Sequence, residues 1–132
     1  MRTFGIKVIV MKTEKKTLVM GASVNPDRYA YRAVKMLQQH GHPVVAIGKK
    51  EDNLDGLHIE KELVDFDGVD TVTLYLNPMN QQKYYDYIIG LKPKRVVFNP
   101  GTENPEFYAL LKENNIEVEV ACTLVMLSLG NY

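Results

Sequence analysis

The feature that most constrains the fold is a short apolar run that ends in a turn of small residues and leads into a helical pattern. From Leu18 the sequence reads LVMGASVNP, in which Gly21, Ala22 and Ser23 form the turn. In α/β proteins such a strand–turn–helix unit directs backbone N–H groups and the positive end of the helix dipole at one spot. The unit therefore predicts a site for an anionic ligand, with a nucleotide as the first candidate.

Along the rest of the chain, apolar runs alternate with helical patterns. Strands are expected at residues 17–20, 43–47, 71–76, 95–98 and 116–120, and helices at 29–40, 77–91 and 104–114. The polar stretch 49–68 is expected to be a loop with a short extended piece near 57–59, and residues 122–129 a docking helix or an extended tail. Because parallel strands require right-handed helical crossovers, this order predicts an α/β fold. We expect one Rossmann-like domain, a doubly wound parallel five-stranded sheet with helices on both faces.

Length and charge exclude several classes. The 132 residues suit one domain at 17–132, with residues 1–16 as an N-terminal extension or an edge strand. Lys plus Arg (16) equals Asp plus Glu (16), which argues against a nucleic-acid or membrane-surface binder. No apolar run approaches the ~20 residues of a membrane span, and the first residues make a poor signal peptide. A cytoplasmic protein is expected, and the single Cys122 suits a reducing compartment.

Sheets of this kind bind ligands beyond the carboxyl ends of their strands, where the strand order reverses. The loops expected at that edge are 21–26, 48–50, 76–78 and 99–103, all rich in small, Asn, Pro or Lys residues. Turns use such residues regardless of function. The first loop is what favours a ligand there.

The turn departs from a dinucleotide fingerprint. G-x-G-x-x-G would place glycine at 21, 23 and 26, where this chain has Gly21, Ser23 and Pro26. An NAD site also needs an acidic residue after the second strand, but Lys49 and Lys50 are found there. Two cations attract a phosphate on the adenosine ribose, which favours NADP or coenzyme A over NAD, unless both lysines are simply solvated.

The start of the following helix carries further charge. Pro26 gives the helix a rigid beginning, and Asp27 is the expected N-cap. Arg28 and Arg32 lie four residues apart and share a face near the helix N-terminus. Cations there oppose the helix dipole, and a bound pyrophosphate would offset this cost. Arg32 is the better candidate for the ligand, since Arg28 is free to pair with Asp27.

Two segments carry a resemblance to a known family. They are VMGASVNPDRYAYRAVKMLQQHGHPVVAIG and, later, VVFNPGTENPEFYALLKENNIEV followed by Ala121 and Cys122. Both are similar to the small single-domain CoA-binding proteins and, through them, to the CoA-binding N-terminal domain of the succinyl-CoA synthetase α subunit. The resemblance covers roughly residues 17–124.

The resemblance implies that coenzyme A is bound through its ADP moiety. The pyrophosphate would lie on the Gly-Ala-Ser loop, the ribose phosphate beside the two lysines, and the loop after the third strand on the other side. The residues expected to bind the cofactor are Gly21, Ala22, Ser23, Pro26, Arg32, Lys49, Lys50, Asn77, Pro78 and Gly101. The chain departs from the family pattern at Ala30, often Ser, at Gly48-Lys49, often Asn-Pro, and at the turn 99–101, which replaces a Gln-containing version.

No catalytic residue and no metal site is predicted. His40 suits a cation at a helix C-terminus, and His58 lies in a polar connection without an obvious paired carboxylate. Cys122 follows the last strand and is expected to be either a small buried residue or a thiol partner of the cofactor.

The sequence thus favours a non-catalytic protein that binds coenzyme A or an acyl-CoA. Two alternatives stay open: an NADP-linked oxidoreductase or redox sensor, and a degenerate Rossmann domain that acts through protein contacts. Tyr84, Tyr85 and Tyr87, with the apolar residues 124–129, also make a homo-oligomer a possible partner state.

Overall fold

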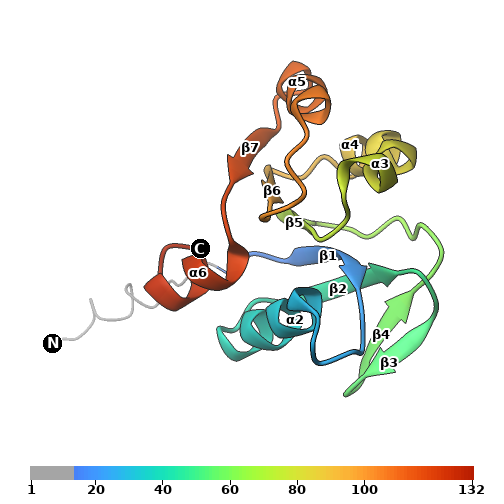
Figure 1. Cartoon of the computed structure of the whole chain (residues 1–132), viewed down its shortest axis with the longest axis vertical. Helices are drawn as coiled ribbons and strands as arrows, with labels where there is room; N and C mark the ends of the chain where they lie inside the picture. The colour runs from blue at the N-terminus through green and yellow to red at the C-terminus, as the bar shows by residue number, and fades with distance from the viewer. Residues whose placement is uncertain (1–13) are drawn as a thin grey trace, which may run out of the picture.

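A seven-stranded sheet runs through the computed structural model, which describes residues 14–132 (Figure 1). Its strands are β1 (Thr17–Ala22), β2 (Val44–Gly48), β3 (Asp52–Leu54), β4 (Leu57–Glu60), β5 (Thr71–Leu74), β6 (Arg95–Phe98) and β7 (Glu117–Val120). They follow the order β3-β4-β2-β1-β5-β6-β7, and only the β3–β4 pair is antiparallel. The part of the expected N-terminal extension or edge strand that falls at residues 1–13 lies outside the described residues.

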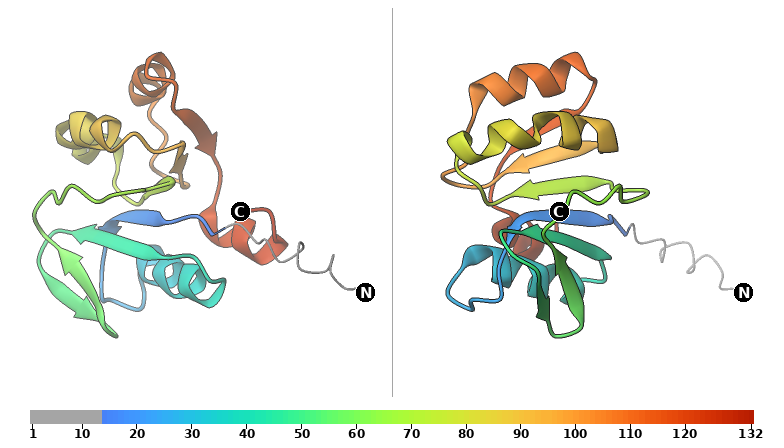
Figure 2. Two further views of the ribbon diagram at one scale, coloured as in Figure 1. Left: turned by 180° about the vertical axis from the view of Figure 1, so that it is seen from behind. Right: turned by 90° about the vertical axis from the view of Figure 1, so that its right-hand side faces the viewer.

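Helices cover both faces of this sheet (Figure 2). They are α2 (Tyr29–Gln39), α3 (Pro78–Gln81), the 3-10 helix η1 (Gln82–Tyr84), α4 (Tyr85–Leu91), α5 (Pro105–Glu113) and α6 (Thr123–Leu129). Helices α2 and α6 pack on one face, and α4 and α5 on the other. The predicted doubly wound α/β class is therefore confirmed, with two strands more than expected.

Successive side chains of β1 point to opposite faces of the sheet, so this strand contributes to the apolar core on each face. Leu18 and Met20 pack with Phe107 of α5 on one face, whereas Val19 packs with Leu37 of α2 on the other. All of these side chains are fully buried. Such a strand reads as a continuous apolar run, which is the pattern of a parallel strand covered on both sides. No helix within residues 14–132 is long and apolar enough to cross a membrane.

The stretch 49–68 contains a hairpin that the sequence analysis took for a loop. Strands β3 and β4 are joined by Asp55 and Gly56, which have φ angles of 49° and 95°. A two-residue turn with both φ angles positive is the favoured hairpin turn, and Asp-Gly is its strongest sequence signal. The extended piece expected near 57–59 is strand β4, whereas β3 and its pairing with β4 were missed because strands this short show little periodicity around the turn.

Two helix predictions also need correction. The single helix expected at 77–91 is divided into α3, η1 and α4. The N-cap of α2 is Arg28 and not Asp27, whose backbone N–H donates instead to Asn25 Oδ1 at 3.0 Å. The open choice at 122–129 is resolved as helix α6.

The three tyrosines considered for self-association are partly buried against the core. Tyr85 stacks on Phe107 with ring centroids 4.2 Å apart, and the Tyr87 hydroxyl donates to the carbonyl of Val64. Burial raises the pKa of Tyr87 to about 12. These rings therefore contribute to the fold, and the oligomeric state stays a prediction.

Asn99, which is 1% exposed, ties the carboxyl ends of the central strands together. Its amide Nδ2 donates to Thr73 Oγ1 at 2.7 Å and to the Leu74 carbonyl at 2.8 Å. Its Oδ1 accepts from the Thr123 backbone N–H at 2.8 Å. One side chain thus connects β5, β6 and the start of α6.

We predict that Asn99→Ala lowers the free energy of unfolding by about 3 kcal/mol, because buried donors and acceptors lose their partner. Asn114→Ala is the matched control, since the exposed Asn114 makes one side-chain bond, to the Leu110 carbonyl. The control should cost less than about 1 kcal/mol. Urea unfolding measures both values, and equal costs would contradict the role given to Asn99.

Candidate functional site

The strand order reverses at β1. The chain goes from β1 through α2 to β2 on one side, and β5 later pairs with β1 on the other. The loops after β1 and β5 therefore leave the sheet in opposite directions from neighbouring strands. In doubly wound sheets a crevice for ligands forms at this place.

Backbone contacts bring three loops together at this edge. Gly21 has φ +92°, and a Cβ on it would lie 2.8 Å from the Tyr75 carbonyl oxygen after β5. A Cβ on Gly48, at the end of β2, would lie 2.5 Å from the Ala22 carbonyl oxygen. Real Cβ atoms do not approach oxygen this closely, so glycine at both positions allows the loops to meet. Gly21, Ala22 and Gly48 are thus neighbours, and the expected site residue Lys49 directly follows Gly48.

The turn between β1 and α2 is held by hydrogen bonds among its own residues. Ser23 Oγ accepts from the Asn25 N–H at 3.0 Å, and the Arg28 N–H donates to the Asn25 carbonyl at 3.0 Å. The Ser23 hydroxyl proton remains available as a donor. Pro26 is exposed in this turn. Its ring fixes the backbone φ angle and so restricts the conformation of the loop.

The amino end of α2 is open. No side chain caps it, and its first turn contains no acidic residue. The backbone N–H groups of Tyr29 and Ala30 have no acceptor among the described residues. Because these groups carry the positive end of the helix dipole, they form a place for an anion.

Four exposed cations belong to the two neighbouring segments: Arg28 and Arg32 at the start of α2, and Lys49 and Lys50 directly after β2. None forms an ion pair with a carboxylate of residues 14–132. The Arg32 guanidinium lies over the Tyr29 ring, 5.4 Å from its centroid. The alternative in which Arg28 pairs with Asp27 is therefore not the arrangement found.

On the β5 and β6 side, the expected site residues already have partners. The Asn77 side chain caps α3 by accepting from the Asn80 N–H at 3.0 Å, and Pro78 is the first residue of that helix. The Gly101 N–H donates to Glu103 Oε1 at 2.8 Å. These residues lie at the predicted edge, but their polar groups are less free than those around α2.

Gln81 is a fully buried residue that the sequence analysis missed. Its Nε2 donates to the carbonyls of Leu76 and Thr102, both at 2.8 Å, and its Oε1 accepts from Asn104 Nδ2 at 2.9 Å. Gln81 thereby connects the loops after β5 and β6. No local pattern distinguishes it from an exposed helical glutamine.

Tyr75 and Cys122 follow the carboxyl ends of β5 and β7, at the same edge of the sheet. The Tyr75 hydroxyl is buried and makes no hydrogen bond of ordinary geometry within the described residues. Burial raises the pKa of this phenol, and the neighbouring Cys122 raises it further. Cys122 is half-buried, and whether it meets a ligand stays a prediction.

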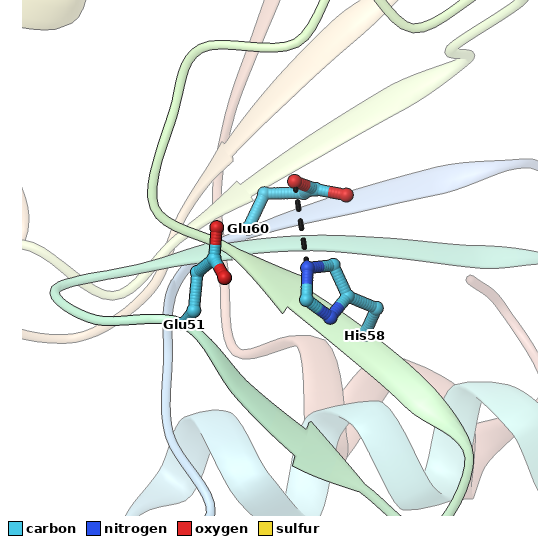
Figure 3. A group of neighbouring side chains, drawn as sticks. All are labelled: Glu51, His58 and Glu60. Atoms are coloured by element: carbon cyan, nitrogen blue, oxygen red, sulfur yellow. Dashed lines mark ion pairs between the residues drawn. The ribbon is translucent and has the colours of Figure 1, made fainter.

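The histidines lie away from the α2 amino end. His40 is the C-cap residue of α2, and His42 Nδ1 accepts from the Lys15 N–H at 3.0 Å. The expectation that His58 has no carboxylate nearby is wrong, because its Nε2 lies 3.6 Å from Glu60 Oε1 (Figure 3). This contact was missed because the hairpin was taken for a loop.

Two clefts lie at the opposite edge, near the amino ends of the strands. Their volumes are about 410 and 430 Å³. Lys15, His42 and Tyr132 line the first, and Lys16, Pro43 and Asp70 are among those lining the second. Neither contains a residue expected to bind the cofactor, and ligands of doubly wound sheets bind at the carboxyl edge.

Comparison with known proteins identifies the family. Residues 15–128 match the family described as the CoA binding domain. The chain belongs to this family. None of the curated proteins compared matches the chain.

Solved structures share this fold. One described as an uncharacterized protein is 51% identical with a TM-score of 0.89, covering 92% of this chain and all of its own. A hypothetical protein from Pyrococcus horikoshii OT3 is 28% identical with a TM-score of 0.76, covering 92% of this chain and 86% of its own. A conserved hypothetical protein from Pyrococcus furiosus is 26% identical with a TM-score of 0.70, covering 81% of this chain and 92% of its own.

We predict that Gly21→Ala destabilises the protein by about 3 kcal/mol, from the left-handed φ and the clash with Tyr75 together. Gly101→Ala is the control, because Gly101 also has a positive φ of 93° but nothing lies within 4 Å of its Cβ position. That variant should cost only about 1 kcal/mol. Urea unfolding compares the two, and a Gly21 variant no worse than the Gly101 variant would overturn the close approach of the loops.

Proposed function

We propose that this protein binds coenzyme A, or an acyl-CoA, without carrying out chemistry on it. The family supports the ligand. The observation that supports its location is the open amino end of α2 at the strand reversal, where the N–H groups of Tyr29 and Ala30 have no acceptor within residues 14–132. A pyrophosphate oxygen would supply these donors with an acceptor and interact favourably with the helix dipole.

The Gly-Ala-Ser loop would hold the pyrophosphate. Gly21 and Ala22 bring backbone close to the ligand without a bulky side chain, and the Ser23 hydroxyl offers a donor. Pro26 keeps the turn rigid before the helix begins. Arg32, on the first turns of α2 and without an ion pair to any carboxylate of residues 14–132, would add a charge-assisted bond to the phosphates.

Lys49 and Lys50 would bind the phosphate on the adenosine ribose. Gly48 places the beginning of this loop against Ala22, so both lysines follow directly from the edge of the pyrophosphate site. Both are exposed and without ion pairs in the described part of the chain. Coenzyme A carries a phosphate at this ribose, whereas NAD does not.

Asn77, Pro78 and Gly101 would form the opposite wall. Their polar groups serve the α3 cap and the Glu103 contact, so they would shape the site more than bind phosphate. His40 lies at the end of α2, His42 beside Lys15 and His58 on the β3–β4 hairpin. None of the three is on the Gly-Ala-Ser loop or in the first turn of α2, which supports a binding role for that part of the site.

Isothermal titration with coenzyme A, acetyl-CoA, NADP and NAD tests the proposal. Coenzyme A should bind and NAD should not. Ser23→Tyr should abolish binding, since a ring would fill the loop, while Ser128→Tyr on the exposed surface of α6 should leave it unchanged. Urea unfolding shows whether each variant is folded. Binding of NADP alone would contradict the proposal, and coenzyme A binding by a folded Ser23→Tyr variant would contradict the location.

Removal of the two lysine charges tests whether Lys49 and Lys50 bind the ribose phosphate and not the pyrophosphate. The double variant Lys49→Ala/Lys50→Ala should lose roughly tenfold or more in affinity for coenzyme A, because charge-assisted bonds to phosphate are lost. Its affinity for dephospho-CoA, which lacks the ribose phosphate, should change little. Lys83→Ala/Lys112→Ala removes two exposed cations elsewhere and is the control. Equal losses for both ligands would contradict the assignment of these lysines.

A further inference from the structure

Three metal-ligating side chains meet at the β3–β4 hairpin, outside the fold's core and beside the loop of Lys49 and Lys50, and none of them is a residue proposed to bind the cofactor. Glu51, His58 and Glu60 each offer a donor atom, and these atoms all lie within 4.8 Å of one another (Figure 3). The three residues come from the loop before β3 and from β4.

The hairpin register explains why they meet. Asp52 pairs with Ile59 and Asn53 with His58, so the next position of the ladder sets Glu51 opposite Glu60. His58 and Glu60 are two residues apart on one strand and share a face. Because Ile59 between them is buried against the α2 side, the three polar side chains lie on the other face of the hairpin.

The hairpin holds this arrangement in place. The Gly56 N–H donates to Asn53 Oδ1 at 2.8 Å across the turn, and Asp55 forms an ion pair with Lys35 of α2. On its other side β4 pairs with β2 through Ile47 and Glu60. The ligands therefore lie on a braced element of the sheet and not on a free loop.

Within residues 14–132, the two carboxylates have no cationic partner of permanent charge. Neither Glu51 nor Glu60 forms an ion pair with a lysine or arginine within residues 14–132, although Lys50 and Lys61 adjoin them in sequence. The recorded partner is His58, with Nε2 3.6 Å from Glu60 Oε1. A divalent cation among the three groups would compensate both negative charges at once.

We propose that Glu51, His58 and Glu60 bind a divalent transition metal, with zinc as the reference ion. Zinc takes imidazole nitrogen and carboxylate oxygen at about 2.0–2.2 Å, which places two tetrahedral ligands about 3.4 Å apart. The 3.6 Å between His58 and Glu60 is already close to this value. A donor atom of the exposed Glu51 lies within 4.8 Å of the other two, and rotation of this side chain would change that separation.

Three protein ligands leave a coordination position for water. The His58 side chain is 51% exposed and that of Glu60 28%, so solvent reaches the site. An imidazole in the set favours zinc, nickel or copper over magnesium, which prefers oxygen ligands alone. Discrimination between zinc and magnesium is therefore part of the proposal.

Titration of the metal-free full chain with zinc chloride at neutral pH tests it by calorimetry, without coenzyme A. We expect one zinc ion per chain, and roughly 100-fold weaker binding in His58→Ala, Glu51→Gln and Glu60→Gln. His40→Ala and Glu62→Gln remove an exposed histidine and an exposed glutamate outside the cluster and should bind like the parent protein. Magnesium chloride at the same concentration should not displace the zinc.

The imidazole ¹⁵N resonances give a second readout, because coordination shifts the Nε2 signal of His58 and leaves that of His40 in place. Urea unfolding confirms that each variant is folded. No zinc binding, equal losses in the control variants, an unshifted His58 signal or displacement by equal magnesium would each overturn the site. Since no arm of this experiment uses coenzyme A, its failure is independent of failure of the proposed cofactor function.

Discussion

The arrangement of the candidate site depends on close backbone contact at the carboxyl end of β1. Gly21 packs against the Tyr75 carbonyl, and Gly48 packs against the Ala22 carbonyl, at distances that exclude a Cβ atom. These contacts join the loops after β5 and β2 to the loop after β1. Because α2 begins one short turn later, its open amino end faces the same edge. The geometry of the proposed phosphate site therefore follows from how closely three backbones approach, more than from any individual polar side chain.

The two sides of this edge differ in how far their polar groups are satisfied. Beyond β5 and β6, the buried Asn99 amide donates to the end of β5, and the buried Gln81 amide donates to carbonyls of the two loops and connects them. Beyond β1 and β2, backbone N–H groups at α2 and the charges of Lys49 and Lys50 have no partner among the described residues. The polar groups of the β5 and β6 loops are thus hydrogen-bonded within the protein, whereas those of the β1 and β2 loops are positive and lack partners within residues 14–132. This difference suits an elongated anionic ligand that binds mainly to the β1 and β2 loops.

Much of the fold follows from local pattern. Apolar runs separated by helical periodicity gave the five parallel strands and the doubly wound class, since a strand such as β1 is apolar on both faces. The β3–β4 hairpin was missed although Asp55-Gly56 is a strong turn signal, because its strands are only three and four residues long. The N-cap of α2 was misplaced by one residue because Asp27 still belongs to the preceding turn, where its N–H donates to Asn25 Oδ1, and the helix begins after Arg28.

The sequence by itself determined the order of elements, the loops that share the carboxyl edge and the cations that stand there, because these depend on residue periodicity and on the rules of parallel sheets. Only the tertiary structure decided which polar groups are already occupied, as Asn77 and the Gly101 N–H are. It also decided that Glu51 and Glu60, nine positions apart, meet beside His58. Such meetings depend on strand register and close packing between distant segments, which no local pattern of residues encodes.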